Sequence, residues 1–297
     1  MTEIEISQDI VKAPKRTSEF RRFVRVMSSR WVVVFGFVII LILVLTAIFA
    51  PFLAPYPPNQ QDLGATTQNP SQAHWLGTDA LGRDQFSRII FGSRIAILVG
   101  VVAVALAAIV GMAMGLVAGY FGGWVQIVIM RFIDALMAFP PIVLILAIAV
   151  LLGGGLFNVL LAIGIGLLPT YGRLMYGQIL ALKQNDYVTA AGSIGASNMR
   201  IMFFHLLPNA FPSLLILITL NMGTAILMEA SLSFLGIGIS PSIPTWGSMV
   251  NVGYQYILIN PWLSLSPGIA ILLVVLAFNL VGDGFRDALD PRLRGRI

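Results

Sequence analysis

The chain alternates long apolar runs with short polar segments. An α-helix needs about 20 predominantly apolar residues to cross the hydrocarbon core of a membrane. Six runs reach that length, at residues 31–54, 94–118, 124–152, 157–176, 210–235 and 263–282. The pattern therefore predicts an all-α membrane protein with six transmembrane helices.

The composition supports a multispanning membrane protein and excludes several kinds of site. Hydrophobic residues make up 58% of the chain, charged residues only 10%, and the mean hydropathy is +0.90. A soluble domain carries about 25% charged residues. There is no Cys, which excludes disulfides, zinc thiolate sites and cysteine nucleophiles. No P-loop, zinc-ligand motif or dinucleotide turn is present, so we expect no catalytic residue and no metal site in this chain.

The basic residues predict an orientation, because Lys and Arg in short loops favour the cytoplasmic side. With a cytoplasmic N-terminus, the inside segments hold Lys12, Lys15, Arg16, Arg21, Arg22, Arg25, Arg30, Arg131, Arg173, Lys183, Arg200, Arg286, Arg292, Arg294 and Arg296. The outside segments then hold only Arg83, Arg88 and Arg94. We therefore expect both termini, and the segment between the fourth and fifth spans, on the cytoplasmic side. A basic flank beside an apolar span indicates membrane orientation and not nucleic-acid binding.

That cytoplasmic segment, DYVTAAGSIGASNMRIMFFHLLPN at 186–209, predicts a helix with little side-chain bulk. Asp186 is placed to cap its start. Its small residues are Ala190, Ala191, Gly192, Gly195 and Ala196. Pairs of them stand four residues apart and would stack on one helix face. Pro208 is expected to end this helix or to start the next. These residues fit a docking helix and fit equally a linker on the membrane surface.

Three features inside or beside the spans are candidates for the transport pathway. Pro140 and Pro141 must kink the third span, because each removes a helical hydrogen bond. Glu229 is a lone carboxylate in the fifth span, which either lines a path or ties spans together. Trp246 follows in an outer loop, where an indole at the membrane surface is typical of an aromatic anchor.

The remaining charged groups predict local ion pairs. Arg131 and Asp134 stand at i and i+3 and can neutralise each other on one helix face. The outer segment HWLGTDALGRDQFSRIIFGS, at 74–93, alternates acidic and basic residues, which suggests a turn followed by a helix start with ion pairs between near neighbours. His74 has no cluster of partners nearby in the sequence, so we interpret it as structural.

Four motifs together resemble one family. The Ala190-Ala191, Gly195 and Leu207-Pro208 pattern resembles the EAA loop of ABC importer permeases, with Thr189 in place of the family's leading Glu. The 74–93 segment, the run AGYFGGWVQIVIMRFIDALMAFPP and the closing NLVGDGFRDALDPRLR resemble the C-type permease subunit of dipeptide, oligopeptide and nickel importers. The resemblance covers nearly the whole chain after about residue 30.

The resemblance implies a type I ABC importer permease fold and a role as half of a translocation pathway in the bacterial inner membrane. It implies a second, B-type permease, two cytoplasmic ATPases that bind ATP and Mg, an extracytoplasmic substrate-binding protein, and contact with membrane lipid but no nucleic acid. The coupling residues it implies are Asp186, Thr189, Ala190, Ala191, Gly192, Gly195, Ala196, Arg200, His205 and Pro208. In the family, the segment around Trp246 lies near the mouth of the pathway.

The expected organisation follows from the spans and the resemblance. It comprises an N-terminal tail at 1–30, a first transmembrane helix at 31–54, an extracytoplasmic segment at 55–93, a permease core at 94–284 with a coupling loop at 178–209, and a C-terminal tail at 285–297. The alternative function is a proton-coupled secondary transporter, but repeated halves and midplane carboxylates are not evident. An intramembrane protease would need a Ser/His pair or two Asp residues within spans, which the sequence does not supply.

Overall fold

The computed structural model describes residues 27–289, and the predicted tails at 1–30 and 285–297 lie largely outside that range. The described residues form helices, and the only bridge between extended residues joins Thr78 to Asp84. In chain order the elements are α2 (Trp31–Ile48), α3 (Ala50–Leu53), η1 (Leu63–Ala65), α4 (Gln85–Phe121), α5 (Gly123–Met137), α6 (Pro141–Leu152), α7 (Leu156–Leu182), α8 (Asp186–Ser193), α9 (Asn198–Arg200), the π-helical η2 (Ile201–Leu206), α10 (Leu207–Phe234), α11 (Trp246–Gln255) and α12 (Trp262–Leu289). The all-α prediction is confirmed.

Five segments of the described chain are long and apolar enough to cross a membrane: α2, α4, α7, the segment Asn198–Phe234 and α12. The bent pair α5 and α6 makes a sixth if it crosses as one span. The two helices meet at 93°, and the break lies at Pro140, which precedes α6, and Pro141, its first residue. The predicted kink is therefore confirmed.

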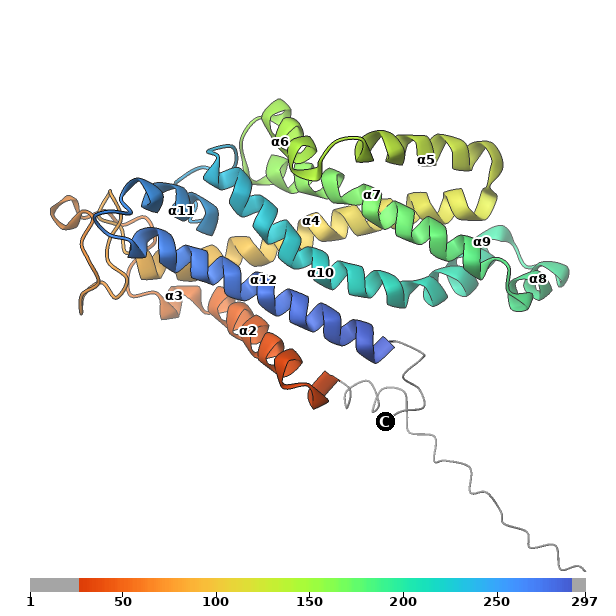
Figure 1. Ribbon diagram of the computed structural model, residues 1–297, viewed down its shortest axis with the longest axis horizontal. Coiled ribbons are helices and arrows are strands. Elements are labelled where there is room, and N and C mark those ends of the chain that lie inside the picture. Colours follow the sequence, from red (N-terminus) through yellow and green to blue (C-terminus); the bar gives the residue numbers. More distant parts are fainter. Residues whose placement is uncertain (1–26, 290–297) are drawn as a thin grey trace, which may run out of the picture.

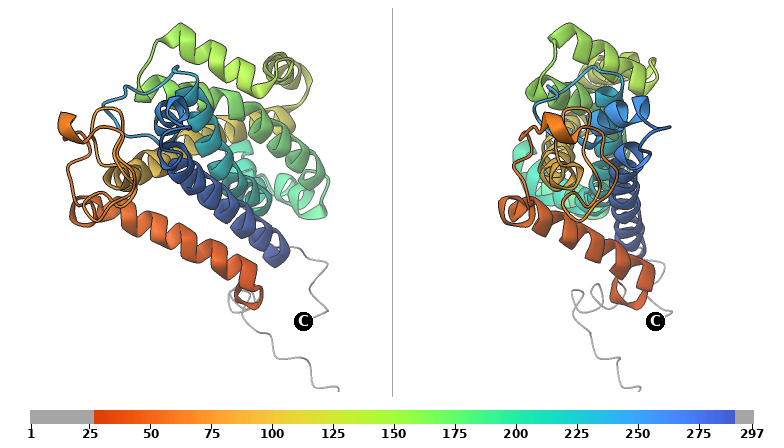
Figure 2. Two further views of the ribbon diagram at one scale, coloured as in Figure 1. Left: turned by 60° about the vertical axis from the view of Figure 1, so that its left-hand side comes forward. Right: turned by 90° about the vertical axis from the view of Figure 1, so that its left-hand side faces the viewer.

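The long helices run along the long axis of the molecule, and most of the connections between them lie at its two ends (Figure 1). One end carries α8 and α9, and the other carries α11 and the loops that precede α4. Figure 2 shows α5 and α6 on one side of the bundle and α2 on the opposite side. Among the described helices, α4 and α7 share the most extensive contact.

Glycines explain how α4 and α7 approach so closely. Gly111, Gly115 and Gly119 repeat every fourth residue and so lie on one face of α4. A Cβ at Gly115 would stand 2.3 Å from the carbonyl oxygen of Gly172 in α7. Small residues at this spacing let membrane helices pack backbone to backbone. The run GMAMGLVAG, at 111–119, carries the sequence signal for this packing.

Two elements differ from the expectations. Helix α4 begins at Gln85, well before the apolar run at 94–118, because Asp84 accepts a hydrogen bond from the Ser87 amide at 2.7 Å and caps the helix. The predicted outer loop contains α11, whose start is capped by Thr245. A Cβ at Gly247 would stand 2.4 Å from the carbonyl oxygen of Ala230, so α11 lies directly against α10.

Candidate functional site

The segment from Asp186 to Asn209 leaves the bundle at the end of α7 and returns to it in α10; we call it the coupling segment. Lys183, just after α7, donates to the Tyr120 carbonyl oxygen at 2.6 Å, and its ammonium lies 5.4 Å from the Tyr120 ring centre. The Tyr120 hydroxyl in turn donates to the side-chain oxygen of Asn198 at 2.8 Å. The end of α4 thus fixes both the departure and the return of the coupling segment.

Helix α8 ends sooner than the sequence suggested. Gly195 has φ +83°, outside right-handed helical geometry. The Gly195 amide donates to the Gly192 carbonyl oxygen and the Ala196 amide to that of Ala191, both at 3.0 Å. This is a Schellman termination. The predicted stacking of Gly195 and Ala196 on the face of one helix was therefore wrong, because both lie beyond the helix end.

The start of α8 also differs from the prediction. Asn185 occupies the capping position, without a side-chain capping bond, and Asp186 is the first helical residue. Asp186 was therefore wrongly predicted as the cap, although a carboxylate in the first turn still interacts favourably with the positive end of the helix dipole.

The segment returns through α9 and η2. Ser197 caps α9 by accepting from the Arg200 amide at 3.4 Å. His205 contacts the Arg200 carbonyl oxygen through Nδ1 at 3.2 Å. Pro208 lies in the first turn of α10, directly after the π-helical turn. Of the two predicted positions for Pro208, the start of a helix is the observed one.

The coupling segment exposes large apolar side chains. Ile194 is 86% exposed and Phe204 77%, while Met199 and Phe203 are also exposed. A surface hollow of about 790 Å³ is lined by Ser197, Met199, Arg200, Phe203, Phe204 and His205. In α8 only Val188 and Ala191 are buried, and Thr189, Ala190 and Gly192 face outward. The segment therefore presents a mixed apolar and basic surface that residues 27–289 leave uncovered.

The pathway candidates divide into exposed and buried positions. Pro140 and Pro141 are exposed at the bend between α5 and α6. Glu229 is buried in α10 and accepts from the Ser233 hydroxyl at 2.6 Å. Trp246 is only 4% exposed and donates from Nε1 to the Ile89 carbonyl oxygen at 3.0 Å. The indole therefore does not act as a surface anchor, because it packs between α11 and α4.

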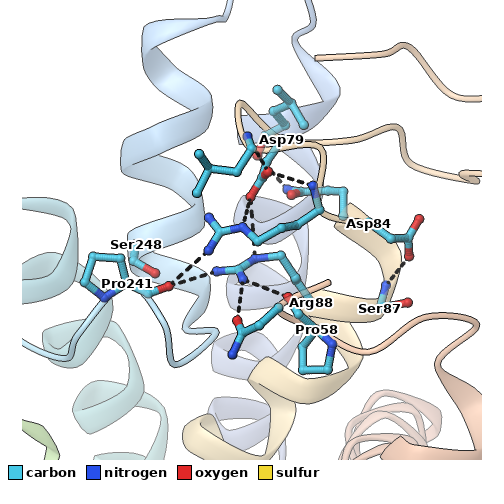
Figure 3. Close-up of polar contacts among 12 residues, drawn as sticks. Pro58, Asp79, Asp84, Ser87, Arg88, Pro241 and Ser248 are labelled. Atoms are coloured by element: carbon cyan, nitrogen blue, oxygen red, sulfur yellow. Dashed lines mark hydrogen bonds and ion pairs between the residues drawn. The ribbon is translucent and has the colours of Figure 1, made fainter. Parts of the chain in front are cut away.

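At the opposite end of the bundle, the charges of the 74–93 segment are buried (Figure 3). Asp79 accepts from Arg83 Nε at 2.6 Å, and Arg88 Nε lies 3.8 Å from the same carboxylate oxygen. Arg88 also donates to the Pro58 carbonyl oxygen at 2.9 Å. The predicted ion pairs form, and they additionally join segments distant in the sequence.

His74 has one partner, since its Nδ1 lies 2.8 Å from the Asp84 carboxylate, and its structural role stays a prediction. One prediction about charged partners was wrong. Asp134 pairs with Arg173 in α7 and not with Arg131 in its own helix. Because α5 packs along α7, the Asp134 carboxylate reaches Arg173, which is more distant in the sequence than Arg131. Similarly, Asp287 pairs with Arg30.

Comparison with known proteins identifies this arrangement as a membrane permease. Residues 111–295 match the family described as the binding-protein-dependent transport system inner membrane component, and residues 18–70 match the N-terminal transmembrane domain of oligopeptide transport permease C. The chain belongs to this family of ABC importer permeases.

Relatives match over nearly their whole length. The glutathione transport system permease protein GsiD of Pectobacterium atrosepticum is 41% identical, over 96% of this chain and 95% of its own. The dipeptide transport system permease protein DppC of Alkalihalophilus pseudofirmus is 42% identical, over 93% and 91%. The probable D,D-dipeptide transport system permease protein DdpC of Escherichia coli is 42% identical, over 95% and 96%.

A solved structure supports the fold. A chain of the MetNI methionine ABC transporter, in an inward-facing conformation, superposes with a TM-score of 0.54 over 68% of this chain and 97% of its own, at 19% identity. Family and fold together support an ABC permease over a secondary transporter. In this family the permease subunit crosses the membrane, and separate ATPase subunits hydrolyse ATP.

Proposed function

We propose that this permease forms half of the pathway of a bacterial inner-membrane importer and that its coupling segment docks on a cytoplasmic ATPase. The partners are a second, B-type permease, two ATPases that bind ATP and Mg, and an extracytoplasmic binding protein. The N- and C-termini face the cytoplasm. The names of the relatives favour a small peptide over nickel as the substrate.

The observation that carries the coupling role is the uncovered surface of α8, α9 and η2. Exposed Phe203, Phe204 and Met199 border one hollow, and Arg200 and His205 add basic groups to it. Aromatic side chains and Arg are enriched where protein interfaces concentrate their binding energy. Tyr120 also contacts Lys183, just before the segment, and Asn198, within it, so a movement imposed by an ATPase would be transmitted directly to α4.

The other four candidates, Pro140, Pro141, Glu229 and Trp246, shape the pathway or hold its helices in place. Pro140 and Pro141 shape the bend that faces the pathway or the partner permease. Glu229 and Trp246 hold α10 and α11 in place, since both side chains are buried and hydrogen-bonded within the chain. The coupling loop spans 178–209 and the permease core 94–284, as the spans suggested.

The structure selects Gly192 as the residue on which to test docking. Gly192 is exposed in α8, and a Cβ placed there meets no atom within 4 Å. Arg is a better helix former than Gly by roughly 0.7 kcal/mol, so Gly192→Arg should not destabilise α8. We expect the variant to insert normally, to co-purify poorly with its ATPases and to lose transport. Gly195→Arg is less informative, because the positive φ of Gly195 strains any side chain.

Ala73→Arg is the matched control, because Ala73 is an exposed small residue at the opposite end of the bundle. Ala65 is unsuitable, since it is buried. The control should retain both ATPases and transport. If Gly192→Arg keeps full co-purification and substrate-stimulated ATP hydrolysis in vesicles, the coupling role of this surface is wrong.

A further inference from the structure

A small cavity lies at the end of the bundle opposite the coupling segment. Its volume is about 120 Å³, and its lining includes Asp79, Arg83, Arg88, Ser248, Asn251 and Val252. The cavity is bordered by the start of α4, the 236–241 connection, α11 and the start of α12. Arg83, in the turn before α4, and Arg88, in its first turn, both donate to the Pro241 carbonyl oxygen, and Figure 3 shows Arg88 between Pro241 and Pro58. We call Asp79, Arg83 and Arg88 the arginine cluster.

The arginine cluster carries more positive than negative charge. The side chains of Arg83 and Arg88 are only 8% and 3% exposed, and Asp79 is the carboxylate that both contact. Asp79 is already engaged by the amides of Leu81 and Arg83 at 2.9 and 3.0 Å and by Arg83 Nε. Arg88 Nε remains 3.8 Å away, so its charge is weakly neutralised. Two guanidinium groups and one carboxylate leave one buried positive charge, which is costly without a partner.

Neighbouring carboxylates do not supply the missing negative charge. The Asp84 carboxylate already contacts His74 Nδ1 and accepts the Ser87 amide hydrogen bond that caps α4. Glu229 accepts from Ser233, which lines the cavity, but Glu229 is not among the lining residues. Where Arg83 and Arg88 converge, both donate to the neutral Pro241 carbonyl oxygen, at 3.4 Å each. These are long bonds for guanidinium donors, which pair with carboxylates at about 2.7–2.9 Å.

We propose that the arginine cluster binds the carboxylate group of a small solute. A monovalent carboxylate matches the single surplus charge, and its two oxygens suit the planar donors of guanidinium groups. The cavity has room for a carboxylate group with a short stem. It lies at the end where substrate would arrive if the coupling segment is cytoplasmic. Assigning the carboxylate to the C-terminus of an imported peptide rests on the proposed function.

The test measures the thermal stability of the purified transporter complex against acetate concentration, with sodium chloride at equal ionic strength as the reference. A ligand that binds the folded state raises its melting temperature by mass action. We expect a saturable rise with acetate. Arg88→Gln should weaken acetate binding at least tenfold. Arg94→Gln, on the same helix, is the matched control: Arg94 is exposed and donates to the Ala47 carbonyl oxygen without touching the cavity, so acetate should act as in wild type.

A second variant separates a binding site from a structural ion pair. Asp79→Asn keeps an oxygen acceptor for the turn but removes the charge that competes with the ligand. It should lower the melting temperature without acetate and raise acetate affinity severalfold, the opposite of Arg88→Gln. A purely structural pair predicts no acetate-dependent change in either variant. An equal rise with chloride and acetate, or no saturable rise in wild type, would overturn the carboxylate site.

Glycylglycine and its C-terminal amide then identify the source of the carboxylate. Stabilisation by glycylglycine but not by the amide supports a peptide C-terminus as the ligand. Stabilisation by acetate alone overturns the peptide assignment. These results are independent of ATPase co-purification, so failure here and failure of the coupling role remain distinguishable.

Discussion

At one end of the bundle Arg83 and Arg88 are buried, whereas at the other Phe204 and Ile194 are exposed to solvent. The first end is held by hydrogen bonds within the chain. They join the loop before α4 to the α10–α11 and α11–α12 connections, and the first residue of α4 to the start of α12. At the second end, hydrogen bonds to Tyr120 and the buried Val188 and Ala191 hold the coupling segment, while its largest apolar side chains stay exposed. The first end therefore buries its charged side chains within the chain, whereas the second leaves its large apolar side chains exposed, as the proposed docking role requires.

The largest expected effect on stability is at the first end. A Cβ at Gly82 would stand 1.8 Å from the Asp62 carbonyl oxygen, and Gly82 has φ +70°. Overpacking and left-handed strain together predict that Gly82→Ala lowers the free energy of unfolding by about 3 kcal/mol. Gly192→Ala, at the other end, should leave it unchanged or raise it by up to about 1 kcal/mol. Thermal unfolding in detergent compares the two variants. Equal melting temperatures would contradict the expected difference in stability between the two ends.

A smaller effect is expected at Glu229. Glu229→Leu leaves the buried Ser233 hydroxyl without its acceptor, at a cost of about 1–3 kcal/mol. Glu229→Gln retains an acceptor oxygen and should cost less. The measurement is the yield and melting temperature of the solubilised permease. If both variants are as stable as wild type but transport is lost, Glu229 acts in the pathway and not in packing.

Substitutions at the coupling end should weaken ATPase binding without changing the stability of the permease. Phe204 is 77% exposed, so Phe204→Ala should change the free energy of unfolding by no more than about 0.5 kcal/mol. An aromatic side chain at an interface centre contributes more than about 1 kcal/mol to binding, so ATPase affinity should fall about tenfold. Trp75→Ala removes an aromatic that is 61% exposed at the other end and should leave ATPase affinity unchanged. Equal losses in both variants would argue against a specific docking surface.

The same contrast explains what the sequence could and could not predict. The length of an apolar run predicts a transmembrane span, because crossing the membrane requires only a minimum number of consecutive apolar residues. Pro140 and Pro141 also act locally, so the bend was predictable. The burial of Arg83 and Arg88 was not, since it depends on α11 and Pro241, more than 150 residues away. An alternating charge pattern describes a solvated turn and a buried network equally well.

In the coupling segment the limit was backbone geometry. Gly195 suits the middle of a small-residue face and also a left-handed helix end. Its spacing from Ala191 predicted the former, and the structure shows the latter. Spacing identified the surface but not where its helix ends. A pattern of small residues does not predict the exposed Phe203 and Phe204. Aromatic residues in a segment outside the spans are the signal that points to them.

Single-cysteine substitutions at exposed positions, which perturb the protein least, test whether the two ends lie on opposite sides of the membrane. The chain has no Cys, so single cysteines can be labelled without background. Ile194 is 86% exposed in the coupling segment, and Gln72 is exposed at the opposite end. Gln72→Cys should alter neither stability nor transport, and Ile194→Cys should leave stability unchanged, because both side chains are exposed. In intact cells an impermeant maleimide should label Gln72→Cys, and Ile194→Cys should react only after permeabilisation.

The same pair decides the number of spans. Between residues 72 and 194 lie α4, the bent pair α5 and α6, and α7. Figure 1 shows α5 and α6 returning the chain from the far end of α4 to the start of α7, so the pair should cross as one span. Three crossings place the two cysteines on opposite sides. Labelling of both from outside would mean that the pair does not cross. Labelling of Ile194→Cys alone would keep the six spans but place the coupling segment outside, away from any cytoplasmic ATPase.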